Sequence, residues 1–208
     1  MMPTVVTTAT LAYYLGESVV TPEMEMALER AEAIAASRIG CRELKYRTVE
    51  ETVLVHDEHH TMLGGLSSLA RLQMPVLHLS DGPARQVNAL TLKIGDETRN
   101  LLEGARISET GWAIHYRFPV AFGFKIDLPY DEVLIDAEYD AGWEDEVDLP
   151  NGIRQFVIAQ ATQIYATPIG GVIKVRLGDN YVDLSPSAIA KQVDQYAEMM
   201  DQWVRVRL

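Results

Sequence analysis

Residues 133–166 read VLIDAEYDAGWEDEVDLPNGIRQFVIAQATQIYA, and within this stretch a strand pattern changes to a helix pattern. Residues 133–139 form a strand-like run, and from Ile135 to Tyr139 apolar and acidic side chains alternate with the period of two that is typical of a half-buried strand. After Pro150, apolar residues recur at steps of three and four, which predicts a helix over about 151–166. We expect this helix to be central and largely buried, with Phe156 and Ile164 in its core.

Two further helices are predicted by the same signal, a proline at the first position of the helix. At this position the fixed φ of proline suits the helix, and its missing N–H is not needed. Pro22 opens a helix that Gly40 ends, and Pro186 opens a last helix that runs to about residue 203. Each carries one apolar stripe. The stripes are Met24, Leu28, Ala31, Ala35 and Ile39 in the first, and Ile189, Val193, Tyr196, Met200 and Trp203 in the last.

Short strand-like runs occupy the chain between the first two helices. They span 48–56, 87–94, 112–116, 121–126 and 133–139. A hairpin is predicted after the second helix, where 172–177 and 181–184 are joined through Gly178-Asp179-Asn180. This order predicts an α+β fold, with helices packed around a small, mostly antiparallel sheet. We expect an N-terminal extension (1–20), a single α+β domain (21–203) and an extended C-terminal tail (204–208).

The composition argues against several classes of protein. Thirty acidic and eighteen basic side chains give a net charge of −12, which is the wrong sign for non-specific attraction to nucleic acid. The single cysteine, Cys41, cannot form an internal disulfide, fits a reducing cytoplasm and is expected to be packed rather than reactive. No signal peptide and no run of about eighteen apolar residues is present, so neither export nor a membrane span is predicted.

The densest cluster of possible metal ligands is His56-Asp57-Glu58-His59-His60. These imidazoles could converge on a metal if the stretch were helical. It follows a strand-like run, however, and the HExxH order of zinc hydrolases is absent, so a solvated loop is the simpler interpretation. No P-loop, dinucleotide fingerprint or nucleophile elbow occurs either. No catalytic residue, cofactor or metal site is therefore predicted.

Ten carboxylates and no basic side chain lie between residues 127 and 148. They are Asp127, Asp131, Glu132, Asp136, Glu138, Asp140, Glu144, Asp145, Glu146 and Asp148. A glycosidase needs two carboxyl groups that face each other across a cleft, and a continuous acidic run supplies no such pair. We expect a solvated acidic face, or an electrostatic role against nucleic acid or a basic neighbour.

The chain ends in Val204-Arg205-Val206-Arg207-Leu208, in which apolar and basic residues alternate with the period of a strand. A short strand cannot stabilise itself, and no later segment exists in this sequence for it to pair with. It is therefore expected to add to this domain's sheet or to an edge on another subunit, the alternative being a frayed tail. Two arginines on an acidic protein favour a partner. The predicted partner-binding residues are Trp203, Val204, Arg205, Val206, Arg207 and Leu208.

Three motifs stand in order in the last third of the chain. The stretch 137–143 reads AEYDAGW and ends a strand, 148–154 reads DLPNGIR and opens a helix, and Gly178-Asp179 lies in the later hairpin. They resemble the motifs Y-x-A-G-[YF], x-L-P-x-x-I-[RK] and G-D of the head-tail connector (adaptor or head-completion) proteins of long-tailed bacteriophages. Met74-Pro75-Val76 resembles the start of a family strand, whereas 57–71 and 104–111 depart from the family as longer loops.

The resemblance implies a structural virion protein of the phage neck, made in the bacterial cytoplasm, without cofactor or enzymatic activity. Its subunits would form a ring, twelve-fold to match the portal, that connects the portal to a tail or stopper protein and lets DNA pass without specific binding. The C-terminal segment would attach to the portal or another neck protein. Channel-lining or inter-subunit roles would fall to the acids Glu144, Asp145, Glu146 and Asp148. The alternatives are another neck or tail-completion protein, or a small cytoplasmic metal-dependent hydrolase that uses His56 to His60.

Overall fold

Residues 4–54, 76–94, 96–116, 133–166, 173–177 and 180–204 are described in the computed structural model. The chain divides into two compact units. The helical unit comprises Met1–Tyr46 and Gly142–Leu208, and the strand unit comprises Arg47–Ala141. The predicted α+β class is confirmed, and every pairing between named strands is antiparallel. A single α+β domain over residues 21–203 stays a prediction.

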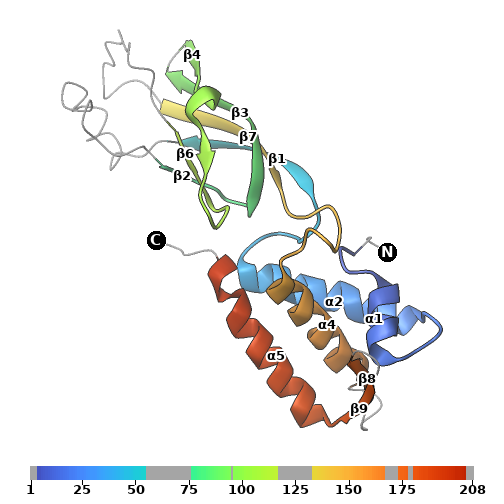
Figure 1. The fold of residues 1–208 in the computed structure, drawn as a ribbon. Coiled ribbons are helices and arrows are strands. Elements are labelled where there is room, and N and C mark those ends of the chain that lie inside the picture. The colour runs from blue at the N-terminus through green and yellow to red at the C-terminus, as the bar shows by residue number, and fades with distance from the viewer. Residues whose placement is uncertain are drawn as a thin grey trace. The chain divides into compact units, whose positions relative to one another are not determined.

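Four helices and one C-terminal 3₁₀ turn form most of the described helical unit (Figure 1). Their bounds are α1 Thr8–Leu15, α2 Pro22–Ile39, α4 Asn151–Ala166, α5 Pro186–Met200 and η3 Asp201–Trp203. Helix α4 lies between α2 and α5 and packs on both. Thr21 caps α2 by accepting from the Met24 N–H, and Gly40 ends it at φ 90°. All five residues of the predicted α2 stripe are buried.

The buried residues of α4 agree with the prediction except at Ile164. Ile153, Phe156 and Val157 are buried, as are most of the residues between them and Ala161. The prediction for Ile164 is wrong, because its side chain is only half-buried and lines a hollow beside α2. The helix begins after Pro150, whose carbonyl accepts from the Arg154 N–H at 3.0 Å. In the predicted α5 seam Ile189 and Met200 are buried, and the other three members are half-buried.

Helix α1 lies within the segment that the sequence predicts only as an extension. Thr7 caps it by accepting from the Thr10 N–H, and Leu11 and Leu15 are buried. Two preceding residues, Val5 and Val6, are buried as well. This segment therefore belongs to the core of the helical unit. A two-stranded hairpin of β8 Ile173–Leu177 and β9 Asn180–Leu184 is also present, as predicted, while 178–179 lie outside the described residues.

The described residues of the strand unit form two antiparallel sheets. The larger has the order β1-β7-β3-β4, with bounds β1 Arg47–Leu54, β7 Val133–Ala141, β3 Ala84–Ile94 and β4 Glu97–Asn100. The smaller has the order β2-β6-β5, with bounds β2 Val76–His78, β6 Ala113–His115 and β5 Arg106–Ile107. A 3₁₀ turn, η2 Leu102–Gly104, precedes β5. Four predicted strands are confirmed in place, and 121–126 lies outside the described residues.

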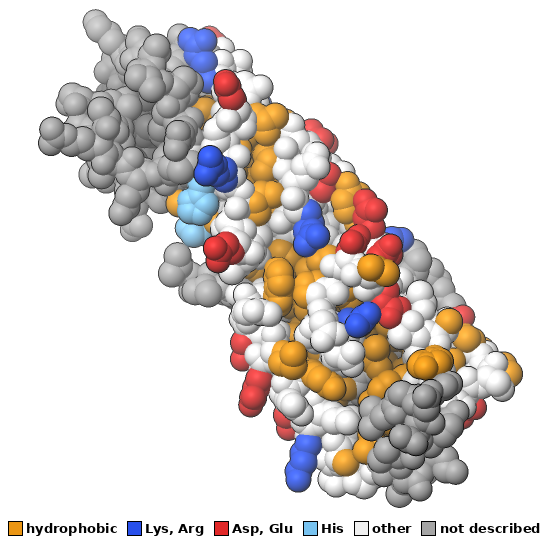
Figure 2. All heavy atoms as spheres, viewed as in Figure 1, with side chains coloured by type: hydrophobic (Ala, Val, Ile, Leu, Met, Phe, Trp, Pro, Cys, Tyr) orange, Lys and Arg blue, Asp and Glu red, His pale blue; other side chains and the backbone are white. Residues whose placement is uncertain are grey.

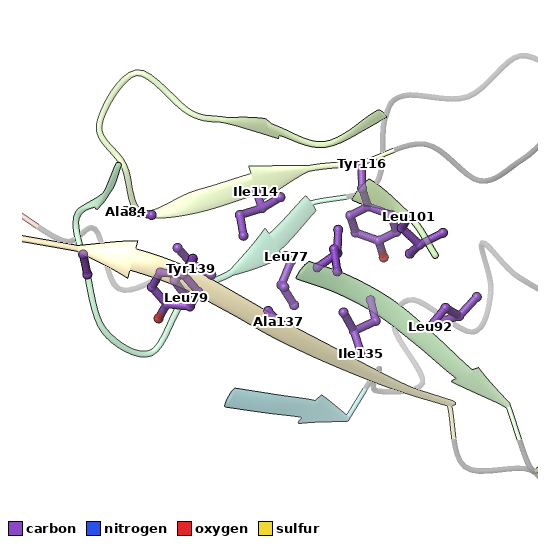
Figure 3. Packing of buried hydrophobic residues seen from close by; sticks show 12 residues of the cluster. Leu77, Leu79, Ala84, Leu92, Leu101, Ile114, Tyr116, Ile135, Ala137 and Tyr139 are labelled. Atoms are coloured by element: carbon purple, nitrogen blue, oxygen red, sulfur yellow. The ribbon is translucent and has the colours of Figure 1, made fainter. Parts of the chain in front are cut away.

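The core of the strand unit collects side chains from both sheets (Figure 3). Its members include Leu77, Leu79, Leu90, Leu92, Leu101, Ile114, Tyr116, Ile135, Ala137 and Tyr139. On β7 every second residue, Ile135, Ala137 and Tyr139, points into this core, so the intervening residues belong to the opposite face. Burial raises the pKa of Tyr139, whose hydroxyl donates to the Asp81 carbonyl at 2.7 Å.

Candidate partner-binding surfaces

The C-terminal end of the described chain is held against the helical unit by two contacts. The Trp203 ring packs edge-on against Trp143, with ring centroids 6.3 Å apart and an interplanar angle of 81°. The Arg38 guanidinium pairs with the Asp201 carboxylate at 3.1 Å. Val204 is extended, with φ −68° and ψ 131°. The chain therefore leaves a fixed point at Trp203. Arg205 to Leu208 lie outside the described residues, so their partner-binding role stays a prediction.

Trp143 is itself placed by an unusual backbone contact. Gly142 adopts φ +82°, a conformation that glycine tolerates best. The Trp143 N–H donates to the Leu44 carbonyl at 2.9 Å, and its carbonyl accepts from the Tyr46 N–H at 2.8 Å. Its side chain is 1% exposed. The motif that carries the family resemblance thus coincides with a structural joint of the helical unit.

The acids predicted to line a channel or a subunit contact occupy the turn before α4. Glu146 accepts hydrogen bonds from the Thr7 N–H at 3.2 Å and from the Thr10 hydroxyl at 2.8 Å, so it stabilises the N-terminus of α1. Asp145 Oδ1 accepts from the N–H groups of Val147 and Asp148 and closes its own turn. Glu144 and Asp148 are exposed. The channel role of the four acids stays a prediction.

A second acidic surface lies on the four-stranded sheet, opposite the core. We call it the carboxylate face and define it by Glu50, Asp136, Glu138 and Asp140. Glu50 of β1 stands directly opposite Glu138 of β7. On either side of this pair, Thr48 donates to Asp140 at 2.9 Å and Thr52 donates to Asp136 at 2.8 Å.

Charge compensation is uneven across the carboxylate face. Asp136 forms an ion pair with Lys93. The contact with Lys93 and the hydrogen bond from Thr52 both lower the pKa of Asp136. Asp140 accepts from the Asn88 amide at 2.9 Å. Glu50 and Glu138 have no ion pair with any residue that the structure describes, and they line a shallow hollow of about 370 Å³. Like charges directly opposite each other in a sheet are destabilising. This surface is therefore suited to a cationic partner.

On the core-facing side of β1, opposite the carboxylate face, a polar network ties the strand to the turn after β2. The Arg47 guanidinium forms a two-pronged contact with the Asp81 carboxylate, at 2.6 and 3.2 Å. Glu51 accepts from the N–H of Ser80 at 3.1 Å and from the Ser80 hydroxyl. Together these contacts tie β1 to that turn.

A carboxyl group in the helical unit holds the segment before α1. Glu32 accepts from the Val6 N–H at 2.7 Å. Burial raises the pKa of Glu32 from 4.5 to about 7, although backbone hydrogen bonds from Val6 and Val5 act in the opposite direction. Between pH 4.5 and 7 the folded protein thus retains a proton that the unfolded chain has lost.

Replacing Glu32 with glutamine is expected to make stability less dependent on pH. The pKa of Glu32 is higher in the folded protein than in the unfolded chain. The stabilisation that its proton provides is therefore present below pH 4.5 and is lost as the pH rises to about 7, which lowers the free energy of unfolding by roughly 3 kcal/mol. Urea denaturation at pH 5 and pH 8 measures this loss. Glu32→Gln keeps a carbonyl acceptor for Val6 and should shrink the loss, whereas Glu17→Gln, at an exposed carboxyl, should not. An unchanged pH slope in Glu32→Gln would contradict the assigned burial.

The described residues contain no group of three or more His, Cys, Asp and Glu side chains that could hold a metal ion. The His56 to His60 cluster lies outside them, so a metal site there is neither supported nor contradicted. Cys41 is buried as predicted, and its thiol donates to the Ala36 carbonyl at 3.6 Å. Among the helices in the described ranges, none has both the length and the apolar composition of a membrane span.

No family model matches this chain, and no curated protein matches it. Solved structures do match. A chain in the neck of an empty gene transfer agent (GTA) particle, computed with C6 symmetry, is 14% identical, with a TM-score of 0.50 over 98% of this chain and 91% of that one. A chain in the virion of the native GTA particle is 15% identical, with a TM-score of 0.52 over 100% and 95% of the two chains. At this level of identity the likeness establishes that the fold is shared across nearly the whole length of each chain.

Proposed function

We propose that this chain is a structural subunit of a phage or phage-like neck, an adaptor that forms a ring between the portal and a tail or stopper protein. The observation that carries the proposal is the full-length likeness in fold to chains of the GTA neck and virion. Because more than nine-tenths of both chains is covered, the likeness involves both units and not one common motif.

The positions of the family-like motifs support the same proposal. The AGW motif coincides with the positive-φ joint at Gly142, and Leu149-Pro150 immediately precedes the central helix α4. The Gly178-Asp179 pair falls between β8 and β9. The first two motifs therefore lie at boundaries of described elements and the third lies between two paired strands, as expected if this chain and the connector family share a backbone path.

A ring requires two different surfaces on each subunit that meet head to tail. The helical unit exposes large apolar side chains that its own core does not use (Figure 2). They are Tyr13, Val19, Val20, Met26, Ile34, Tyr46, Val147 and Met199. Exposed apolar surface of this kind is suited to protein contacts. Twelve-fold symmetry, which would match a portal, is part of the proposal. Attachment of each subunit to the portal or to an adjacent neck protein through Trp203 to Leu208 is also part of it.

An acidic body suits a conduit for DNA. A net charge of −12 disfavours adhesion of a duplex to the channel wall, so DNA could pass without being bound. The exposed acids Glu144, Asp145 and Asp148 are the described candidates for this role. No observation in the described residues favours the hydrolase alternative.

The proposal is tested by adding the purified protein to tail-less heads that carry the portal of the same phage. We expect it to co-sediment with these heads and to form a closed ring of density, twelve-fold in symmetry, beneath the portal in electron micrographs. Heads assembled without portal are the control and should bind none. A protein that stays in the supernatant with both kinds of head, under conditions where the cognate tails attach to complete heads, would refute the adaptor role.

A further inference from the structure

We infer that the outer edge of β1 accepts the C-terminal segment 204–208 of a neighbouring copy of this chain as an added strand. The inference rests on the proposed function, and it specifies one of the contacts by which subunits join in the ring. It is carried by the position of β1 in its sheet, by the two faces of β1 and by the alternation of residues in the segment.

Among the described strands, β1 is the last strand of the four-stranded sheet. All eight of its residues, from Arg47 to Leu54, pair with β7 on one side. On its other side it pairs with no strand among those that the structure describes. The unpaired edge of a regular strand presents N–H and C=O groups that can template another strand. The contacts of Arg47 and Glu51 with Asp81 and Ser80 tie β1 to the turn after β2.

The two faces of β1 differ in chemistry. Val49 and Val53 point toward the core of the strand unit and are only partly buried, because β1 is the outermost strand. Thr48, Glu50 and Thr52 point the opposite way and are exposed. A strand added to this edge must therefore carry apolar side chains on one side and polar or charged side chains on the other.

The carboxylate face favours positive charge on the polar side of the added strand. Glu50 and Glu138 stand opposite each other without a cation from the described residues, whereas the flanking Asp136 already has Lys93. A cationic side chain on the next strand would lie beside Glu50 and within diagonal reach of its neighbours. Positive charge at this position would relieve the repulsion between the two glutamates and form charge-assisted hydrogen bonds.

The segment 204–208 has the matching pattern. Val204, Val206 and Leu208 alternate with Arg205 and Arg207. Directly paired residues of neighbouring strands project from the same face, so one parity of register places the arginines beside Glu50 and the apolar residues beside Val49 and Val53. A shift by one residue would reverse both matches, which makes this parity strongly preferred. The described chain ends with Val204 already extended.

The segment that binds the β1 edge is expected to come from a second copy of the chain, because a ring is built from contacts between copies. Each subunit would donate one segment and accept one, which is the head-to-tail arrangement that closes around an axis. A single five-residue strand binds weakly, but repeated contacts around a ring act together. The donated segment then contributes to assembly without needing to hold two isolated subunits together.

Disulfide trapping between two different variant chains tests the inference in a Cys41→Ala background. One chain carries Arg205→Cys and the other carries Thr48→Cys, Glu50→Cys or Thr52→Cys. Residues that pair directly in a sheet lie close enough for a disulfide, about 4.5–5.5 Å between Cα atoms. On heads with an assembled ring, we expect at least one combination to give disulfide-linked dimers, at least five-fold more than Arg205→Cys with Val49→Cys.

The opposite parity supplies the matched control, since Val206→Cys should cross-link to Val49→Cys or Val53→Cys and not to Glu50→Cys. Absence of every β1 cross-link on heads that carry the ring would overturn this inference and leave the proposed function standing. Cross-links that form only when both cysteines are in one chain would also overturn it, because the segment would then dock within its own subunit. Failure of the wild-type protein to bind portal-bearing heads would instead refute the proposed function.

Discussion

Replacing Gly142 with alanine is expected to lower the free energy of unfolding by at least about 2 kcal/mol. A non-glycine residue in the left-handed region costs about 1–2 kcal/mol by itself. The φ of +82° places Gly142 in that region. An added Cβ would also lie 2.7 Å from the Leu44 carbonyl oxygen, and closer still to that of Lys45. Both atoms belong to backbone, so the joint that positions Trp143 would have to open.

Gly40→Ala is the matched control, because Gly40 has a similar φ of +90° and is exposed at the end of α2. It should show the conformational cost alone. For a chain of this size 1 kcal/mol corresponds to a change of about 2–4 °C in Tm. Thermal and urea denaturation of the two variants therefore measure the difference. Equal destabilisation of both would show that the contacts around Gly142 are not as tight as described.

The helices could be predicted in place because local signals and tertiary packing agree in them. Pro22, Pro150 and Pro186 mark three helix starts to within one residue. Ile164 was misassigned because helical spacing identifies an apolar side of a helix but not where its neighbour ends. Helix α1 also had a readable signal, the Thr7 cap with Leu11 and Leu15 four residues apart. It was missed because the helix has only eight residues.

The strands show where sequence patterns stop being informative. Strand β4 reads ETRN and has no apolar alternation, so only its pairing with β3 makes it a strand. Strand β5 has two residues, too few for any pattern. Although Asp140 is buried, the carboxylate face was predicted in part, since Asp136, Glu138 and Asp140 belong to the run of ten acids that was expected to form a solvated acidic face. Its partner Glu50 is 88 positions away from Glu138 in the chain. The register of β1 on β7 cannot be obtained from the spacing of residues in one sequence.

Deleting Val204 to Leu208 is expected to leave a folded, soluble subunit that no longer joins heads to tails. The fold should persist because the deletion begins after Trp203, and the contacts with Trp143 and Arg38 that hold the end of the described chain are made by Trp203 and Asp201. The Tm of the truncated protein should therefore stay within about 2 °C of the wild-type value, a change that corresponds to less than about 1 kcal/mol. Particles made with it should leak DNA or lack tails.

A chain in which Val204 to Leu208 is replaced by five Gly and Ser residues separates the role of sequence from that of length. It should fail as the deletion does, because it lacks both the apolar row and the arginines that alternate in the natural segment. Each lost attachment is weak, but every subunit loses one. The number of subunits bound to portal-bearing heads should therefore fall by much more than the loss of a single weak contact would cause. Co-sedimentation of the truncated protein with such heads at wild-type occupancy would show that the attachment lies elsewhere in the chain.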